Sequence, residues 1–232
     1  MLTLRKSNER GSGDYGWLQT RYSFSFANYY DPQHMGFRSL RVINEDHVAP
    51  NAGFPNHGHR DMEIITYILS GQLAHKDNLG NGSIIDEGKI QRMTAGTGII
   101  HSEFNASGDR PVHLLQIWIE PNQTGLPPSY EEKAINLGAK ADKLQIIATP
   151  TGSGETVTVH QDMTLAVGRL QGNETLTINL DPSRYGWLQV TRGELSINQL
   201  PIQAGDGVAV IVESALNLQS QTDCEFLWFD LP

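Results

Sequence analysis

The sequence predicts an all-β protein whose short strands pack as a sandwich or barrel. Apolar or alternating runs of roughly four to eight residues recur along the chain and are rich in Val, Ile, Leu, Thr and aromatic residues. Turn signals separate these runs, and the 23 glycines and 11 prolines among 232 residues are typical of a fold with many turns. Regularly spaced short strands of this kind favour antiparallel β-architecture.

The expected strands follow from the apolar runs in chain order. They are residues 40–43, 63–69, 89–93, 113–119, 143–148, 164–170, 175–180, 187–190, 208–212 and 225–229. Glycine-containing turns stand between them at residues 79–82, 96–98 and 204–207. Residues 130–140 are the one segment in which we expect a short helix.

A break in this pattern at residues 121–128 predicts a domain boundary. The segment Pro-Asn-Gln-Thr-Gly-Leu-Pro-Pro holds three prolines and one glycine, which make a poor strand and a suitable linker. We therefore expect an N-terminal domain over residues 1–125 and a C-terminal domain over residues 126–232.

The two halves of the chain also resemble each other, which predicts an internal duplication. Residues 65–73 can be laid over residues 187–195, and residues 113–121 over residues 224–232. Seven of the eight histidines precede the linker, and Val212-Glu213-Ser214 stands where the first half has its last histidine pair. The second domain is thus expected to carry no metal ligands.

Charge and cysteine usage exclude several classes of function. The formal net charge is −9, whereas a phosphate backbone is bound mainly by Lys and Arg, so direct nucleic-acid binding is not expected. Cys224 is the only cysteine, so no intrachain disulfide can form, and its apolar surroundings predict a buried, unreactive thiol. Neither a signal peptide nor an apolar stretch of about 18 residues is found, which predicts a cytoplasmic protein without membrane contact.

Two short segments carry the pattern of a metal site. His57-Gly58-His59 and His101-Ser102-Glu103 each place two potential ligands one residue apart. Because side chains alternate along a strand, the two members of each pair point the same way. On facing strands the pairs would bring three imidazoles and one carboxylate to one point, a ligand set that suits a divalent transition metal with open positions.

Other histidines and acids compete less well for this role. A lone histidine pair could be an ordinary loop feature; the second pair is what favours a shared site. Glu63 lies four residues beyond His59, about 13 Å along a straight strand, so we prefer Glu103 as the ligand and expect Glu63 to play a supporting or structural part. The remaining histidines are expected at the surface or in hydrogen bonds, with His160 a candidate for contact between the domains: His34, His47, His75, His113 and His160.

Aromatic residues near the N-terminus leave two alternatives open. They could line an apolar ligand pocket or belong to the core, and core packing is the expected role of Phe24, Phe26, Tyr29 and Tyr30.

These segments resemble the paired motifs of the cupin superfamily, and within it they are similar to pirins. The spacing from Gly96 to His101 is two residues longer than in most cupins, and the His-Ser-Glu-Phe stretch at residues 101–104 resembles the pirin version. Residues 24–32 and 160–163 are also similar to pirins, so that the resemblance spans essentially the whole chain.

The resemblance implies a bicupin of two stacked antiparallel, jelly-roll-like β-barrels with one mononuclear metal in the first. The implied ligands are His57, His59, His101 and Glu103, and Glu103 would also be the catalytic base. Iron is the first expectation for the metal; nickel, manganese, copper, cobalt and zinc are alternatives.

The resemblance also implies a function. Pirins of this kind are associated with quercetin 2,3-dioxygenase activity, in which a flavonol is cleaved with dioxygen and carbon monoxide is released. One alternative is a metal-binding regulator that acts through protein partners and has incidental dioxygenase turnover. Another is a different cupin enzyme, such as a sugar isomerase. The sequence leaves the native metal, the physiological substrate and the oligomeric state open.

Overall fold

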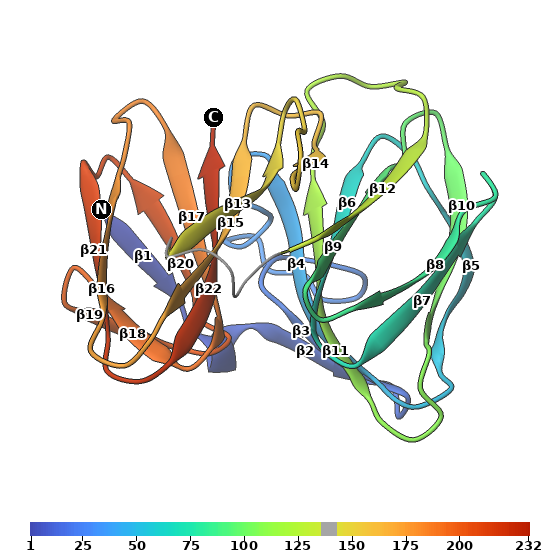
Figure 1. Ribbon diagram of the computed structural model, residues 1–232, viewed down its shortest axis with the longest axis horizontal. Helices are drawn as coiled ribbons and strands as arrows, with labels where there is room; N and C mark the ends of the chain where they lie inside the picture. Colours follow the sequence, from blue (N-terminus) through green and yellow to red (C-terminus); the bar gives the residue numbers. More distant parts are fainter. Residues whose placement is uncertain (136–142) are drawn as a thin grey trace.

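The computed structural model describes residues 1–135 and 143–232, which form two β-domains lying side by side (Figure 1). Each domain has one sheet of seven strands and one of four. The seven-stranded sheets meet at the centre of the molecule, and the four-stranded sheets form its outer sides (Figure 1). Across the described residues the helical structure consists of one 3-10 turn, η1 (Ser7–Glu9). The all-β bicupin prediction is confirmed, with open jelly-roll-like sheets in place of closed barrels.

The first domain contains the predicted metal motifs. Its central sheet consists, in spatial order, of β12 (Ser129–Ala134), β9 (Lys89–Thr94), β6 (Glu63–Ser70), β11 (Val112–Ile119), β4 (Leu40–Val48), β3 (Leu18–Tyr22) and β2 (Gly11–Asp14). Its outer sheet consists of β5 (Gly53–His59), β10 (Ile99–Asn105), β7 (Gln72–Asp77) and β8 (Gly82–Asp86). All neighbouring strands of this domain run antiparallel.

The second domain repeats this plan. Its central sheet consists of β1 (Leu2–Arg5), β20 (Gly207–Ile211), β17 (Tyr185–Arg192), β22 (Cys224–Leu231), β15 (Thr164–Leu170), β13 (Leu144–Thr149) and β14 (Val157–Thr158). Its outer sheet consists of β16 (Thr175–Asn179), β21 (Ala215–Ser220), β18 (Glu194–Ile197) and β19 (Leu200–Gln203).

Corresponding hairpins confirm the internal duplication. Gly71 joins β6 to β7 with a φ of 83°, and Gly193 joins β17 to β18 with a φ of 71°. A Cβ atom would lie 2.8 Å from Pro111 O at the first position and 2.2 Å from Asp223 O at the second. Glycine is therefore required at both turns by conformation and by space, and the alignment of residues 65–73 with residues 187–195 is structurally correct. The alignment of residues 113–121 with residues 224–232 is wrong by one residue, because Ile65 pairs with Ile117 whereas Trp187 pairs with Phe229.

The interface between the domains explains why the central strands are apolar on both faces. One face of each central sheet lines its own domain, and the other packs against the opposite domain. A single buried cluster contains Ile65, Tyr67 and Leu69 of β6 together with Leu227 and Phe229 of β22. Near-continuous burial in β6, β17 and β22 follows from this double packing.

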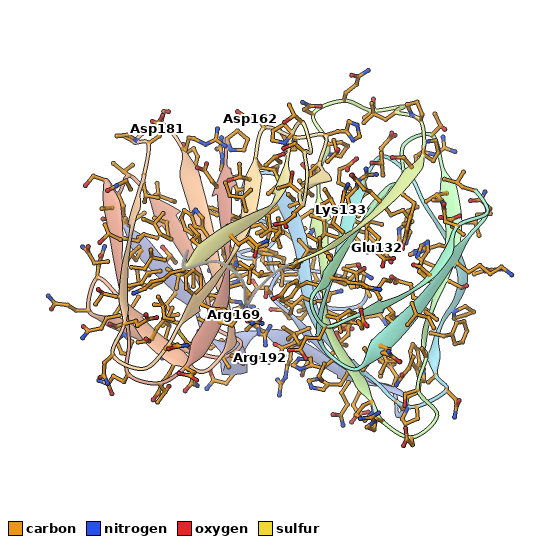
Figure 2. All side chains as sticks on the ribbon, viewed as in Figure 1. Glu132, Lys133, Asp162, Arg169, Asp181 and Arg192 are labelled. Atoms are coloured by element: carbon orange, nitrogen blue, oxygen red, sulfur yellow. The ribbon has the colours of Figure 1, made fainter. Side chains whose placement is uncertain are left out.

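Polar contacts tie the same interface together. The Tyr67 hydroxyl donates to Glu225 Oε1 at 3.0 Å, and Arg169 pairs with the same carboxylate. Arg192 of the second domain reaches Glu87 of the first at 2.7 Å. Figure 2 shows Arg169 and Arg192 near the junction of the two domains.

The interiors of the two domains differ in polarity. Strand register assigns each of four polar residues of the first domain a counterpart in the second, and all four counterparts belong to one apolar cluster. Ile197 corresponds to His75, Leu216 to His101, Leu218 to Glu103 and Ile178 to His57. The sequence analysis placed the counterpart of the last histidine pair at residues 212–214, whereas the strand register places the counterpart of His101 in β21. Aliphatic side chains fill the place of the predicted ligands there.

The predicted helix is wrong where the structure describes it. Residues 129–134 form strand β12, and residues 136–142 lie outside the described residues. β12 pairs with β9, and its Glu131 receives a 2.9 Å ion pair from Arg92, so cross-strand pairing prevails over local helix propensity. At the other end of the chain, β1 joins the second domain by pairing with β20.

Two smaller expectations concern Cys224 and membranes. Cys224 is buried, and its burial raises the thiol pKa, so the prediction of an unreactive thiol agrees with its surroundings. Over residues 1–135 and 143–232, no helix has the length and apolar character needed to cross a bilayer.

Candidate metal centre

Three adjacent strands of the outer sheet in the first domain each place a polar pair on its inner face. β10 lies between β5 and β7, and His101 pairs with His57 on one side and with Asp77 on the other. Two residues farther along β10, Glu103 pairs with His75. The pairs are His57 and His59 on β5, His101 and Glu103 on β10, and His75 and Asp77 on β7.

The three predicted histidine ligands converge. One ligand atom from each of His57, His59 and His101 lies within 4.8 Å of the other two. Their ring centroids are 4.4 Å apart for His57 and His101, 4.8 Å for His57 and His59, and 4.9 Å for His59 and His101. His57 and His59 are half-buried and His101 is buried, so the group is reached from the side of β5.

Glu103 belongs to a second group that shares His101. Its carboxylate lies within 4.8 Å of ligand atoms of His75 and His101. The pairing of β10 with β5 shifts register between His101 and Glu103. At this point a Cβ on Gly53 would lie 2.2 Å from Glu103 O, so the glycine lets β5 approach β10.

The charge states of the histidines suit metal binding. Burial, together with the neighbouring His57, His59 and His75, lowers the pKa of His101 to about 2. Burial and His57 lower the pKa of His59 to about 4. Both rings are therefore neutral near pH 7 and have a lone pair for a cation.

Hydrogen bonds leave ligand atoms of the cluster available. His57 Nδ1 lies 2.8 Å from Pro55 O; since a carbonyl oxygen only accepts, Nδ1 donates and Nε2 keeps its lone pair. His101 Nε2 is buried and has no hydrogen-bond partner among the residues that the structure describes. A buried acceptor without a partner is unfavourable. A cation bound by these imidazoles would remove this penalty, so the residues fit a divalent metal.

Glu103 has the properties of a group that can hold or release a proton. Burial and, to a smaller extent, the nearby Asp46 raise its carboxyl pKa to about 7. The Gln116 amide donates to Glu103 Oε2 at 2.8 Å, and the Thr66 hydroxyl lies 3.5 Å from Oε1. Two neutral partners therefore orient the carboxylate without neutralising it.

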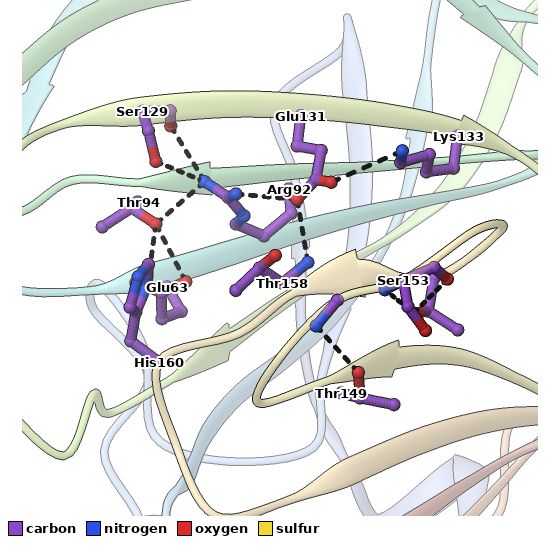
Figure 3. Close-up of polar contacts among 12 residues, drawn as sticks. Glu63, Arg92, Thr94, Ser129, Glu131, Lys133, Thr149, Ser153, Thr158 and His160 are labelled. Carbon is purple, nitrogen blue, oxygen red and sulfur yellow. Dashed lines mark hydrogen bonds and ion pairs between the residues drawn. The ribbon is translucent and has the colours of Figure 1, made fainter.

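Glu63 lies outside this cluster. Its carboxylate contacts Thr94 and His160 at the domain interface (Figure 3). His160 therefore does join the domains, as its sequence context suggested. His34 is hydrogen-bonded to Asp31, and His113 to Glu45, as expected of histidines outside the site.

His75 and Asp77 are the residues of this cluster that the sequence analysis missed. His75 is buried, and its two ring nitrogens face Asp77 and His101. The spacing rule that singled out residues 57–59 and 101–103 applies equally to residues 75–77.

Aromatic residues border the centre on one side. Trp118 packs edge-on against His59 with 4.9 Å between the ring centroids, and Phe26 packs edge-on against Trp118 at 5.3 Å. Phe24 belongs to the interdomain core, where it packs against Trp187. Tyr30 is 72% exposed. Of Phe24, Phe26 and Tyr30, Phe26 is the one that ring contacts through Trp118 link to the histidines.

Comparison with protein families gives two matches. The family model described as Pirin matches residues 3–119. The model described as Quercetinase C-terminal cupin domain matches residues 146–231.

Individual relatives agree with these matches along the full chain. "Quercetin 2,3-dioxygenase" of Escherichia coli K12 is 42% identical over 232 residues, which cover 100% of this chain and 99% of the relative. "Pirin-like protein" of Caulobacter vibrioides is 36% identical, with 99% of each protein covered. The solved structure of bacterial pirin YhhW from Escherichia coli in complex with nickel(II) has a TM-score of 0.95 at 42% identity and covers 100% of this chain and 99% of its own.

Proposed function

The chain belongs to the pirin family, and from this premise we propose that it is a metal-dependent dioxygenase that cleaves flavonols such as quercetin with dioxygen and releases carbon monoxide. The full-length similarity to a quercetin 2,3-dioxygenase supports this activity. The observation that carries the proposal is the convergence of His57, His59 and His101 within 4.8 Å on the inner face of one sheet.

The metal in this proposal is a divalent transition ion in the first domain. His57, His59, His101 and Glu103 would hold it, with Glu103 joined to the three histidines through the shared His101. The apolar interior of the second domain supports a division of roles between the two domains. Iron remains our first expectation, and the nickel complex of the E. coli relative supports nickel as an alternative.

The residues of the chain provide the proton transfer and the surroundings of the reaction. When bound, the metal supplies a positive charge that lowers the pKa of a hydroxyl group beside it. Glu103 accepts the proton of the flavonol 3-hydroxyl on a carboxylate oxygen, for which a pKa near 7 is suitable. Gln116 donates to Oε2 throughout and keeps the carboxylate oriented. Trp118 and Phe26 provide an apolar border for a flat aromatic substrate.

The test is a measurement of oxygen uptake and carbon monoxide release on metal-loaded protein with quercetin. The proposal predicts equal amounts of oxygen consumed and carbon monoxide formed, and loss of both after chelation. Oxygen uptake without carbon monoxide would contradict the ring cleavage. Negligible turnover together with stable protein partners in pull-down experiments would favour the regulatory alternative instead.

A further inference from the structure

β7 lies on the other side of β10 from β5, and its buried pair of His75 and Asp77 contacts the predicted ligand His101. His75 Nδ1 lies 3.5 Å from His101 Nδ1, a long hydrogen-bond distance, and His75 Nε2 lies 3.2 Å from Asp77 Oδ2. The side chains of His75 and Asp77 have no exposed area. Three side chains thus form a chain of contacts that ends at a predicted ligand, and we call Asp77, His75 and His101 the histidine relay.

The outer members of the relay are fixed in place. The backbone N–H groups of Leu79 and Asn81 donate to Asp77 Oδ1 at 2.9 and 3.0 Å, and the Asn81 side chain donates to Oδ2 at 2.9 Å. The His75 ring stacks on Tyr130 with 4.8 Å between the centroids. Asp77 and His75 therefore have little freedom to present other atoms to each other.

Hydrogen-bond accounting allows one placement of the protons. An ionised carboxylate only accepts, so His75 Nε2 must carry a hydrogen and donate it to Asp77. In neutral His75 the other nitrogen, Nδ1, is then an acceptor, and His101 Nδ1 must donate to it. His101 consequently has its lone pair on Nε2.

The opposite placement fails at the contact between His75 and Asp77. With its hydrogen on Nε2, His101 would have the lone pair on Nδ1, and His75 Nδ1 would have to donate to it. The His75 lone pair would then face the Asp77 carboxylate, which is repulsive.

We propose that Asp77 and His75 are positioning residues that hold His101 in the Nδ1–H form, so that Nε2 is presented to the metal. The inference rests on the proposed metal centre but concerns a proton position that exists without metal. His57 is held in the same Nδ1–H form by a single hydrogen bond, which it donates to the carbonyl oxygen of Pro55. Outer hydrogen bonds of this kind set the tautomer and orientation of histidine ligands in general.

The first experiment measures the tautomers directly. Nitrogen-15 NMR of the metal-free wild-type protein distinguishes Nδ1–H from Nε2–H imidazole, and the relay predicts the Nδ1–H form for His101 and the Nε2–H form for His75. In Asp77→Asn the new amide can keep its oxygen toward the backbone N–H groups of Leu79 and Asn81 while its NH₂ takes the place of Oδ2 beside His75, with the Asn81 side-chain amide turned so that its oxygen accepts. Both tautomers are then expected to reverse. His101 in the Nε2–H form in the wild-type protein would overturn the proposal.

The second experiment measures binding of Ni²⁺ and Fe²⁺ by chelator competition. Asp77→Asn should weaken binding by about 10- to 100-fold, the usual effect of losing such an outer partner. The matched control Asp86→Asn removes a carboxylate of β8 that pairs with Lys89 at the surface, and it should leave affinity unchanged.

Two variants of His75 separate the relay from simple packing. His75→Phe keeps a ring against Tyr130 but removes the acceptor for His101, whereas His75→Asn keeps an oxygen near the place of Nδ1. The relay predicts higher affinity in His75→Asn than in His75→Phe, and the reverse order would contradict it. If wild-type protein bound no divalent metal, the proposed function would fail, while the NMR result would still decide the relay.

Discussion

The carboxylate of Glu63 on β6 binds the ring of His160 from the second domain, with 3.2 Å between Oε1 and Nδ1 (Figure 3). Thr94 donates to the other oxygen at 3.0 Å, and the Glu63 side chain has no exposed area. Glu63 follows His59 by four residues. The second domain, which supplies none of the predicted ligands, therefore anchors the chain just beyond the strand that carries two of them.

Removing this anchor should destabilise the protein. His160→Ala leaves a fully buried carboxylate with Thr94 as its remaining side-chain donor in Figure 3. The expected loss is about 1–3 kcal/mol of unfolding free energy, as for other hydrogen bonds to a buried charged group. Urea unfolding measures it, with His34→Ala as a control at a half-buried histidine bonded to Asp31. Equal midpoints for the two variants would show that the interdomain contact contributes no more than the half-exposed pair of His34 and Asp31.

Replacing the proposed base should reduce turnover while leaving the fold intact. Glu103→Gln keeps an oxygen for the Gln116 amide but cannot accept a proton. We expect the rate of quercetin cleavage to fall by about 100-fold or more. Metal content must be measured on the same sample, because a loss of metal would report the ligand role instead. Unchanged turnover at full metal content would rule out the base role. The control is Glu87→Gln, which changes an exposed carboxylate paired with Arg192.

Metal removal should lower the melting temperature, because a ligand that binds only the folded state stabilises it. At a metal concentration of about 100 times Kd the gain is about 2.7 kcal/mol, which corresponds to a shift of about 5–10 °C for a chain of this size. His59→Ala should abolish most of the shift. His113→Ala, at a histidine stacked on His47 outside the cluster, should retain it. The same shift in both variants would place the metal elsewhere.

The sequence predicted the histidine cluster because strand alternation is a local rule. Two residues separated by one position share a face whatever the rest of the fold does, so His57 could be paired with His59, and His101 with Glu103, from spacing alone. The same spacing pairs His75 with Asp77, but it does not show that β7 lies beside β10. Its proximity to β10 is a property of strand order, and His75 became relevant only once β7 was placed beside the ligand strand.

The same distinction explains the errors in the strand list. Apolar runs identified the central strands, which are buried on both faces. They did not identify β5, whose residues Gly53–His59 are half-buried or exposed and include proline and two glycines. Likewise, β12 has a sequence of Ser, Tyr, Glu, Glu, Lys and Ala, and its conformation depends on the ladder with β9, a long-range contact.

A buried ion-pair network around Glu45 of β4 should make stability fall in acid. Burial alone would raise the pKa of Glu45, but a hydrogen bond from His113 and the charge and hydrogen bond of Arg10 lower it to about 2. The Arg10 side chain is 1% exposed, and Nη2 lies 2.5 Å from Glu45 Oε2. A carboxyl whose pKa is lower in the folded state stabilises the protein above its unfolded pKa, here about 4.5, and loses this contribution as the pH falls toward 2.

The prediction is a difference between two pH profiles of unfolding free energy. Between pH 4.5 and 2, wild-type protein should lose on the order of 3 kcal/mol more than Glu45→Gln, because the substituted side chain does not titrate. The comparison also removes most of the opposing contribution of Asp46, whose pKa is raised to about 6 mainly by burial, with the Glu45 charge as a smaller cause. Chemical denaturation at each pH gives the two curves, with Glu9→Gln at an exposed site as the control. Parallel curves for wild type and Glu45→Gln would mean that the ionised form of Glu45 gains nothing from Arg10 and His113.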